Sequence, residues 1–112
     1  MQPLQNQSNL YRYTSNGEGV FTIGKRLLPA ELAGEALQAR SWLPKPDLPA
    51  GNEYRFYMTE KGKEKYEQTL LLVHKKYLTD IKVEASSFEA VKKIGEVIYK
   101  DEWQVVVKIL VS

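Results

Sequence analysis

Regular alternation of apolar and polar residues predicts most of the strands in this chain. Residues 53–58 read EYRFYM, and every second side chain from Tyr54 to Met58 is large and apolar. A period of two places these side chains on one face of a strand, so that face is expected to be buried. An Asn-Gly pair at 16–17 favours a tight turn and predicts that residues 20–23 return as the second strand of a hairpin. Similar patterns predict further strands at 10–14, 80–85 and 103–111.

Apolar residues three and four positions apart predict three helices, at residues 29–43, 60–78 and 86–98. Thr59 directly follows a predicted strand and is expected to cap the second helix with its hydroxyl. Ser86 and Glu89 have the spacing of a capping box at the start of the third helix. Residues 44–52 contain three prolines and must form a loop between the first helix and the next strand.

The predicted elements follow the order hairpin, helix, strand, helix, strand, helix, strand, which indicates the α+β class. Three helices packed mainly on one face of a four- to five-stranded sheet would bury every apolar stripe. The sheet is expected to be antiparallel or mixed, because strand–helix–strand units can form parallel crossovers. A chain of 112 residues suits one domain, predicted over 10–112 after a disordered polar tail at 1–9.

Composition narrows the classes of function. The chain has no cysteine, which excludes disulfides, thiolate-bound metals and thiol catalysis, and suits a reducing compartment. Its net charge is +2, and the parts before and after residue 52 each carry +1, so neither is a polybasic arm. The first ten residues lack the basic and apolar regions of a signal peptide, and no apolar run is long enough to span a membrane. These features predict a soluble, cytoplasmic protein.

Candidate residues for catalysis or cofactor binding are few. His74 is the only histidine, and it lies on the apolar stripe of the second predicted helix, where a half-buried structural histidine is common. One histidine and no cysteine leave no two-histidine or cysteine metal site, and no nucleotide-binding glycine motif opens a helix. We therefore assign no catalytic residue, no metal and no cofactor from the sequence. A ligand-binding or hydrolytic protein with a pocket at His74 is one alternative.

The segment YRFYMTEKGKEKYE, residues 54–67, resembles one local piece of winged-helix DNA-binding domains. In that piece a wing strand ends in a tyrosine, a threonine and a glycine follow, and a long helix opens. Tyr57, Thr59 and Gly62 match it, and Lys63 is the basic residue that often comes next. The resemblance implies DNA binding. The rest of the chain departs from the family, because a hairpin, one helix and a proline-rich loop precede this strand in place of a helix-turn-helix.

Aromatic and basic residues in the same segment support a broader nucleic-acid hypothesis. Aromatic rings beside cationic side chains are typical of surfaces that bind single-stranded nucleic acid. The candidate residues are Arg55, Tyr57, Lys61, Lys63 and Lys65. Glutamates three or four positions from the lysines offer a different explanation, because such pairs form an ordinary solvated helix face.

The last predicted strand suggests an interface. Its odd-numbered residues from Trp103 to Val111 are apolar and are expected to meet the helices. On the other face, apolar residues interrupt the polar pattern, and exposed apolar patches commonly mark interfaces. The interface candidates are Tyr57, Val106, Lys108 and Leu110. We expect a two-fold homodimer through this face or through the edge of the strand, unless the N-terminal tail or a loop of the same chain covers the face.

These observations favour a small non-enzymatic interaction or regulatory domain that acts through a protein partner or through a second copy of itself. The alternatives are a nucleic-acid-associated protein and a small ligand-binding or hydrolytic protein. No membrane partner is expected.

Overall fold

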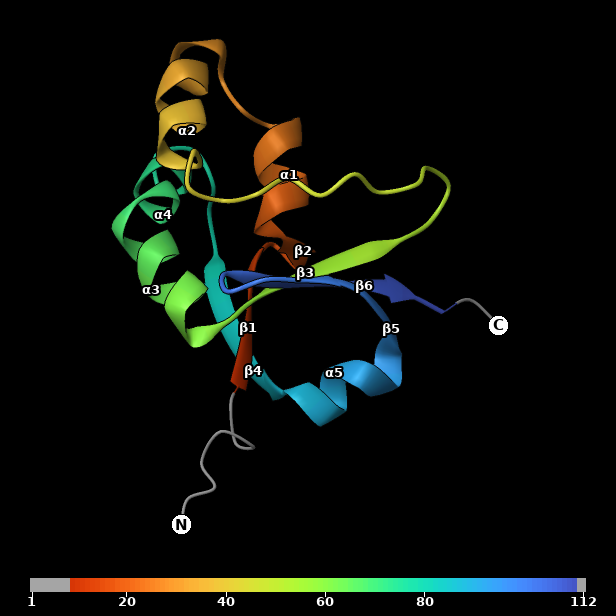
Figure 1. Ribbon diagram of the computed structural model, residues 1–112. Helices are drawn as coiled ribbons and strands as arrows, with labels where there is room; N and C mark the ends of the chain where they lie inside the picture. Colours follow the sequence, from red (N-terminus) through yellow and green to blue (C-terminus); the bar gives the residue numbers. More distant parts are fainter. Residues whose placement is uncertain (1–8, 111–112) are drawn as a thin grey trace.

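The computed structural model describes residues 9–110, which form an antiparallel sheet with helices against both of its faces (Figure 1). The strands are β1 (Asn9–Ser15), β2 (Glu18–Gly19), β3 (Tyr54–Met58), β4 (Ile81–Ser87), β5 (Gly95–Lys100) and β6 (Gln104–Ile109). The α-helices are α1 (Val20–Arg26), α2 (Ala33–Ala39), α3 (Glu60–Gln68), α4 (Leu70–His74) and α5 (Phe88–Ile94), and a short 3-10 turn, Ala30–Leu32, leads into α2.

The α+β class agrees with the sequence prediction, and the details differ. Residues 9–110 contain six strands and five α-helices, where the sequence predicts four or five strands and three helices. The disordered tail predicted at 1–9 lies outside the described residues, except for Asn9, which begins β1.

Strand β1 connects the two parts of the sheet. On one side it pairs along its whole length with β4. On the other side it pairs with β2 through a turn at Asn16 and Gly17, both with positive φ, and with β3 at Tyr11 and Met58. The sheet continues from β3 to β6 and ends at β5. Every pairing between described strands is antiparallel, which decides between the antiparallel and mixed sheets that the sequence allows.

The predicted hairpin is shorter than expected, because residues 20–23 are helical. β2 contains only two residues, and α1 begins directly after it. Valine, phenylalanine, threonine and isoleucine favour strands in isolation. In the fold, Val20, Ile23 and Gly24 are buried at the spacing of a helix that packs against the sheet. Tertiary packing therefore overrides the local preference.

Each of the three predicted helices is shorter in the structure than the apolar stripe that predicts it, or is interrupted. The helix expected at 29–43 is limited to α2 and the 3-10 turn before it. The helix expected at 60–78 is broken at Thr69, whose φ of −131° and ψ of −91° separate α3 from α4. The third helix ends at Ile94, and residues 95–100 form β5, which the sequence analysis does not predict.

Hydroxyl groups cap two of the helices. Thr59 caps α3 as predicted, and its hydroxyl accepts a hydrogen bond from the Gly62 amide at 3.0 Å. α5 is capped by Ser87, one residue after the predicted Ser86, and the Ser87 hydroxyl accepts from the Ala90 amide at 3.1 Å. The position of a cap within a serine pair thus depends on where the preceding strand, β4, ends.

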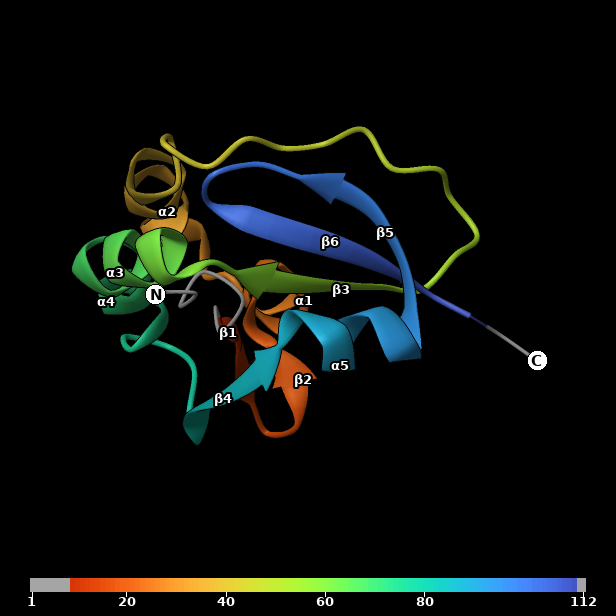
Figure 2. The same cartoon turned by 60° about the horizontal axis from the view of Figure 1, so that its bottom comes forward.

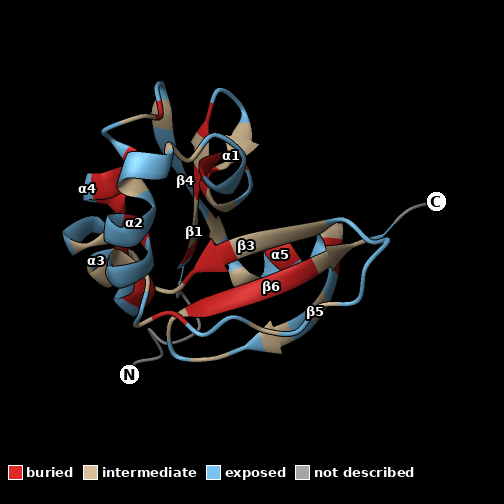
Figure 3. Cartoon of the chain, turned by 90° about the horizontal axis from the view of Figure 1, so that it is seen from above, coloured by how far each residue is buried: buried red, intermediate tan, exposed pale blue. Residues whose placement is uncertain are grey.

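Two hydrophobic cores hold the sheet, one on each face, and β6 is buried along most of its length between them (Figure 3). The larger core lies against α1, α2, α3 and α4 and includes Tyr13, Met58 and Tyr66. The smaller core lies under α5 and includes Tyr57 and Val105. Helices therefore cover both faces of the sheet, whereas the sequence predicts them mainly on one.

The register between β3 and β6 corrects the predicted outer face. Tyr57 pairs with Val105 and Phe56 pairs with Val106, so Tyr57 and Val106 point to opposite faces of the sheet. Tyr57 is 3% exposed in the core under α5, and Val106 is 0% exposed. The prediction that these two residues form one exposed apolar patch is therefore wrong.

The proline-rich segment 44–52 runs over the face of β6 that the sequence predicts to be exposed (Figure 2). The Gln104 side-chain amide donates to the Pro44 carbonyl at 2.7 Å. The Tyr54 hydroxyl donates to the Pro49 carbonyl. These two hydrogen bonds fasten the segment near both of its ends. A loop of the same chain thus occupies the surface that the sequence assigns to a second copy.

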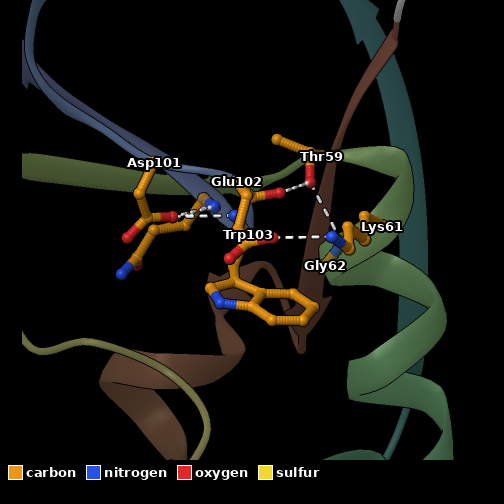
Figure 4. A network of polar contacts seen from close by, with 7 residues as sticks. Thr59, Lys61, Gly62, Asp101, Glu102 and Trp103 are labelled. Atoms are coloured by element: carbon orange, nitrogen blue, oxygen red, sulfur yellow. Dashed lines mark hydrogen bonds and ion pairs between the residues drawn. The ribbon is translucent and has the colours of Figure 1, made fainter.

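The start of α3 is bound closely to the turn between β5 and β6 (Figure 4). The Thr59 amide donates to the Trp103 carbonyl at 3.0 Å, and the Thr59 hydroxyl donates to the Glu102 carbonyl at 2.6 Å. Lys61 forms an ion pair with the Glu102 carboxylate at 2.6 Å. A side chain at Gly62 would overlap the carbonyl oxygen of Trp103, so this close approach requires glycine.

We predict that Gly62→Ala lowers the free energy of unfolding by roughly 2–4 kcal/mol, because the added methyl group meets backbone atoms of the turn. Gly34→Ala is the matched control. Gly34 lies in α2, and no atom lies within 4 Å of the added carbon, so this change should raise stability by up to about 1 kcal/mol. Urea denaturation measures both variants. Equal stability of the two would contradict the close approach.

Candidate ligand-binding cavity

A cavity of about 500 Å³ lies between α1, the end of α2, the proline-rich segment and the sheet. Its apolar walls come from Phe21 of α1, Phe56 of β3, and Leu43 and Leu48 in the chain that follows α2. The ring centres of Phe21 and Phe56 lie 6.1 Å apart. This volume falls within the range of about 300–1,000 Å³ that is usual for sites that bind small organic molecules.

Four cationic side chains and no carboxylate are found among the described residues that line this cavity. Arg26 is neutralised by Glu18, which accepts two hydrogen bonds from the guanidinium at 2.7 and 2.8 Å. Lys25, Arg40 and Lys45 form no ion pair with any residue in 9–110. Three uncompensated positive charges therefore surround an apolar space. Such a cleft attracts a ligand of the opposite charge.

A second cavity of about 280 Å³ adjoins the first. Both are lined by Phe21 and by the same three uncompensated cations, which therefore stand at the boundary between them. The second cavity is further lined by Gly24 of α1, by His74 of α4 and by Tyr77, which follows α4. The rest of its wall is apolar and includes Leu28, Leu37 and Leu70. The two cavities together form one candidate site.

His74 lies in the wall of the second cavity with 4% of its surface exposed. Its Nδ1 atom lies 2.7 Å from the Tyr66 hydroxyl. Burial, reinforced by the positive charge of Arg40, lowers the pKa of His74 to about 4. Burial also raises the pKa of the Tyr66 hydroxyl above its ordinary value. The pair is therefore uncharged at neutral pH, and His74 can offer a hydrogen bond without a charge.

Helix geometry and one side-chain hydrogen bond position the lining residues. Phe21 and Lys25 are four positions apart in α1, so they lie on the same side of that helix. The Tyr77 hydroxyl donates to the Gly24 carbonyl at 2.8 Å, which holds α1 beside the end of α4. Arg40 caps the C-terminal end of α2. No single element makes the site, because α1, α2, α4, the sheet and the proline-rich segment all contribute lining residues.

The predicted nucleic-acid residues do not share an exposed face. Tyr57 is buried under α5 and is not accessible to a base. Lys61 and Lys63 each pair with a glutamate, at 2.6 and 3.1 Å. Arg55 and Lys65 are half-buried. Nucleic-acid binding through these five residues stays a prediction, and their arrangement does not favour it.

The four interface candidates are likewise separated. Tyr57 and Val106 are buried within the chain. Lys108 is half-buried and lines a separate cavity of about 320 Å³ under the far part of the proline-rich segment. Leu110 is 63% exposed. Self-association stays a prediction, and of the four candidates only Lys108 and Leu110 are accessible for it.

Lys25, Arg40 and Lys45 are the candidate residues that the sequence analysis misses. They belong to three segments and form no motif. They do share one signal: none of the three has an acidic residue three or four positions away, whereas Lys61 and Lys63 do. The signal does not separate the three from Arg26, which also lacks such a neighbour and yet pairs with Glu18.

No family model, no curated protein and no solved structure matches this chain. The local likeness to winged-helix domains is limited to the junction between β3 and α3, and the six-stranded sheet around it is a different architecture. Within residues 9–110 no helix has the length and apolar character needed to cross a bilayer. The same residues contain no group of three histidine or carboxylate side chains placed to hold a metal ion. The two adjoining cavities are therefore the basis for a functional proposal.

Protonation of His74 should destabilise the fold. Its pKa is about 4 in the folded chain and 6.5 ordinarily, so between these values the unfolded chain binds a proton that the folded chain does not. The contribution of the neutral His74 ring to the free energy of unfolding is fully present above about pH 6.5. It is lost as the pH falls toward 4, by roughly 3 kcal/mol. We predict that His74→Gln removes this part of the pH dependence. Urea denaturation between pH 7 and 4.5 measures it, and identical pH profiles for the parent and the variant would contradict the assignment.

Proposed function

We propose that this protein binds a small organic anion with an apolar body, in the cavity between α1 and the proline-rich segment. The observation that carries this proposal is the coincidence of aromatic walls with three uncompensated cations, Lys25, Arg40 and Lys45, and no lining carboxylate among the described residues. Phe21 and Phe56 provide the surface for an apolar or aromatic group.

The three uncompensated cations repel one another. Lys25 and Lys45 are exposed, Arg40 is half-buried, and each lacks a carboxylate partner within the described chain. A bound anion offsets this repulsion and also satisfies the donors of Arg40, whose guanidinium is suited to flat oxyanions. The apolar walls add affinity in proportion to the area that they remove from water, about 25 cal/mol per Å².

A binding role is better supported than hydrolysis. General acid–base catalysis by His74 would need a pKa near the working pH, and burial lowers it to about 4. Tyr66, its hydrogen-bond partner, is not a nucleophile at neutral pH, because burial raises the pKa of its hydroxyl. A ligand-binding domain of this kind is compatible with the regulatory role expected from the sequence. The proline-rich segment lines the cavity, so it would contact the ligand on one side and a protein partner on the other.

Two fluorescent probes that differ by one anionic group test the proposal. Anilinonaphthalene sulfonate carries an aromatic body and a sulfonate, and N-phenylnaphthylamine has the same rings without the charge. We predict saturable binding of one sulfonate probe per folded chain. The neutral probe should bind about tenfold more weakly, because it loses the contacts with the cations.

Charge variants distinguish this site from general attraction. Lys45→Gln and Arg40→Gln should each weaken binding of the sulfonate probe about three- to tenfold and leave the neutral probe unchanged. Lys93→Gln is the matched control, because it removes the same charge at a distant site. Lys93 is exposed on α5, which lies on the other side of the sheet. Equal effects of Lys45→Gln and Lys93→Gln, or equal affinity for the two probes, would show that the cavity is not an anion site.

A further inference from the structure

The imidazole of His74 has one nitrogen that the fold leaves without a partner. Nδ1 is engaged with the Tyr66 hydroxyl at 2.7 Å, and Nε2 has no hydrogen-bond partner among residues 9–110. The side chain is 4% exposed, so water reaches it poorly. Buried polar atoms in folded proteins are almost always hydrogen-bonded, and an exception calls for an explanation.

The hydrogen-bonding capacities of the two side chains assign the tautomer. If Tyr66 donates to Nδ1, the hydroxyl proton is satisfied and only the Nε2–H group lacks a partner. If instead Nδ1–H donates to Tyr66, both the hydroxyl proton and the Nε2 lone pair are left unsatisfied. The first arrangement costs less free energy, so Nε2 carries the proton and is a free, uncharged donor.

Gly24 packs closely against this donor. A Cβ atom at position 24 would lie 2.8 Å from Nε2 and 3.3 Å from the Tyr77 hydroxyl oxygen. The Tyr77 hydroxyl is already committed, because it donates to the Gly24 carbonyl. His74, Gly24 and Tyr77 all line the second cavity, which Lys25 and Arg40 also line. The side chain that carries the neutral N–H donor thus lines a small cavity that is bordered by the three uncompensated cations.

We propose that the second cavity is the oxyanion subsite of the ligand site, with His74 Nε2–H as a donor to one oxygen and Lys25 and Arg40 as the balancing charges. The apolar body of the ligand then lies in the first cavity, against Phe56. This inference rests on the proposed function and adds to it the head-group chemistry: a carboxylate, a sulfonate or a phosphate, each of which presents an oxygen that accepts from N–H.

The neutrality of His74 matters for selectivity. A cation attracts any anion, whereas a fixed N–H donor forms a hydrogen bond only with an acceptor atom at the right position. Because Nδ1 is held by Tyr66, the ring orientation and the direction of Nε2–H are both fixed before a ligand arrives. We therefore expect His74 to discriminate between anions of different shape more than it changes the overall attraction for negative charge.

Nitrogen NMR of the imidazole tests the inference directly in the unmodified chain. His74 is the only histidine, so tag-free, ¹⁵N-labelled protein gives a single, unambiguous imidazole pattern. We expect the free protein at neutral pH to show a protonated Nε2 and an unprotonated Nδ1. Addition of anilinonaphthalene sulfonate should shift the Nε2–H signal, saturably and at the same midpoint as the fluorescence titration.

Two variants at the same position give an independent readout. In His74→Gln the side-chain oxygen can accept from Tyr66 and the amide can still donate to a ligand, whereas His74→Met removes both functions. We expect His74→Met to weaken the sulfonate probe about three- to tenfold, His74→Gln to weaken it less, and neither to change the neutral probe. Thermal melts confirm that each variant is folded at the assay temperature.

The outcomes separate the two proposals. Saturable binding of the sulfonate probe without any shift of the Nε2 signal, or an Nδ1-protonated ring in the free protein, would overturn the oxyanion subsite and leave the cavity proposal in place. Absence of saturable binding of the sulfonate probe would overturn the proposed function, and the subsite with it. A shift of Nε2 that also occurs with N-phenylnaphthylamine would assign the effect to ring packing and overturn the subsite.

Discussion

The structure depends most on the contact between the start of α3 and the turn that joins β5 to β6. The Trp103 carbonyl accepts from the Thr59 amide, and a side chain at Gly62 would overlap the same carbonyl. Figure 4 shows Gly62 beside this turn. This contact fixes the hairpin of β5 and β6 relative to α3 and to the helices that share the larger core with α3. The indole of Trp103 also packs edge-on against Trp42, with ring centres 5.2 Å apart, which ties in the end of α2.

The cavities follow from this contact. Gln104 is the next residue after Trp103, and its side chain holds the beginning of the proline-rich segment through the Pro44 carbonyl. The segment can then cross the sheet at a distance from α1, and the space between them is the larger cavity. Prolines suit this role, because a segment with restricted φ angles stays extended without strand partners. A pre-formed space for a ligand costs little conformational entropy on binding.

Sequence reasoning found the features that depend on neighbouring residues. The Thr59 cap and the Asn16-Gly17 turn are local, and both were predicted. α1 and β5 do not follow from local sequence, because distant partners decide them. Val20 and Ile23 have strand propensity but pack as a helix against the sheet. The 95–100 segment continues an apolar helical stripe, and yet it pairs with β6, where no side chain at position 95 would fit beside the Lys108 carbonyl.

The candidate site was predictable only in part, for the same reason. His74 could be named from the sequence as the single histidine on an apolar stripe, but its neutrality follows from burial and from Arg40, which comes from another helix. The cations of the cavity meet because α1, the end of α2 and the proline-rich segment converge over the sheet. No spacing in the sequence encodes that convergence, which depends on the packing of all four parts.

A backbone amide NMR titration with anilinonaphthalene sulfonate tests the central claim most directly, because it locates the bound anion on the fold. The account predicts that the largest shift changes fall on α1 around Phe21 and Lys25, on Arg40 and on residues 44–48, while α5 is unchanged. Changes concentrated on α5, or spread evenly over the surface, would contradict it.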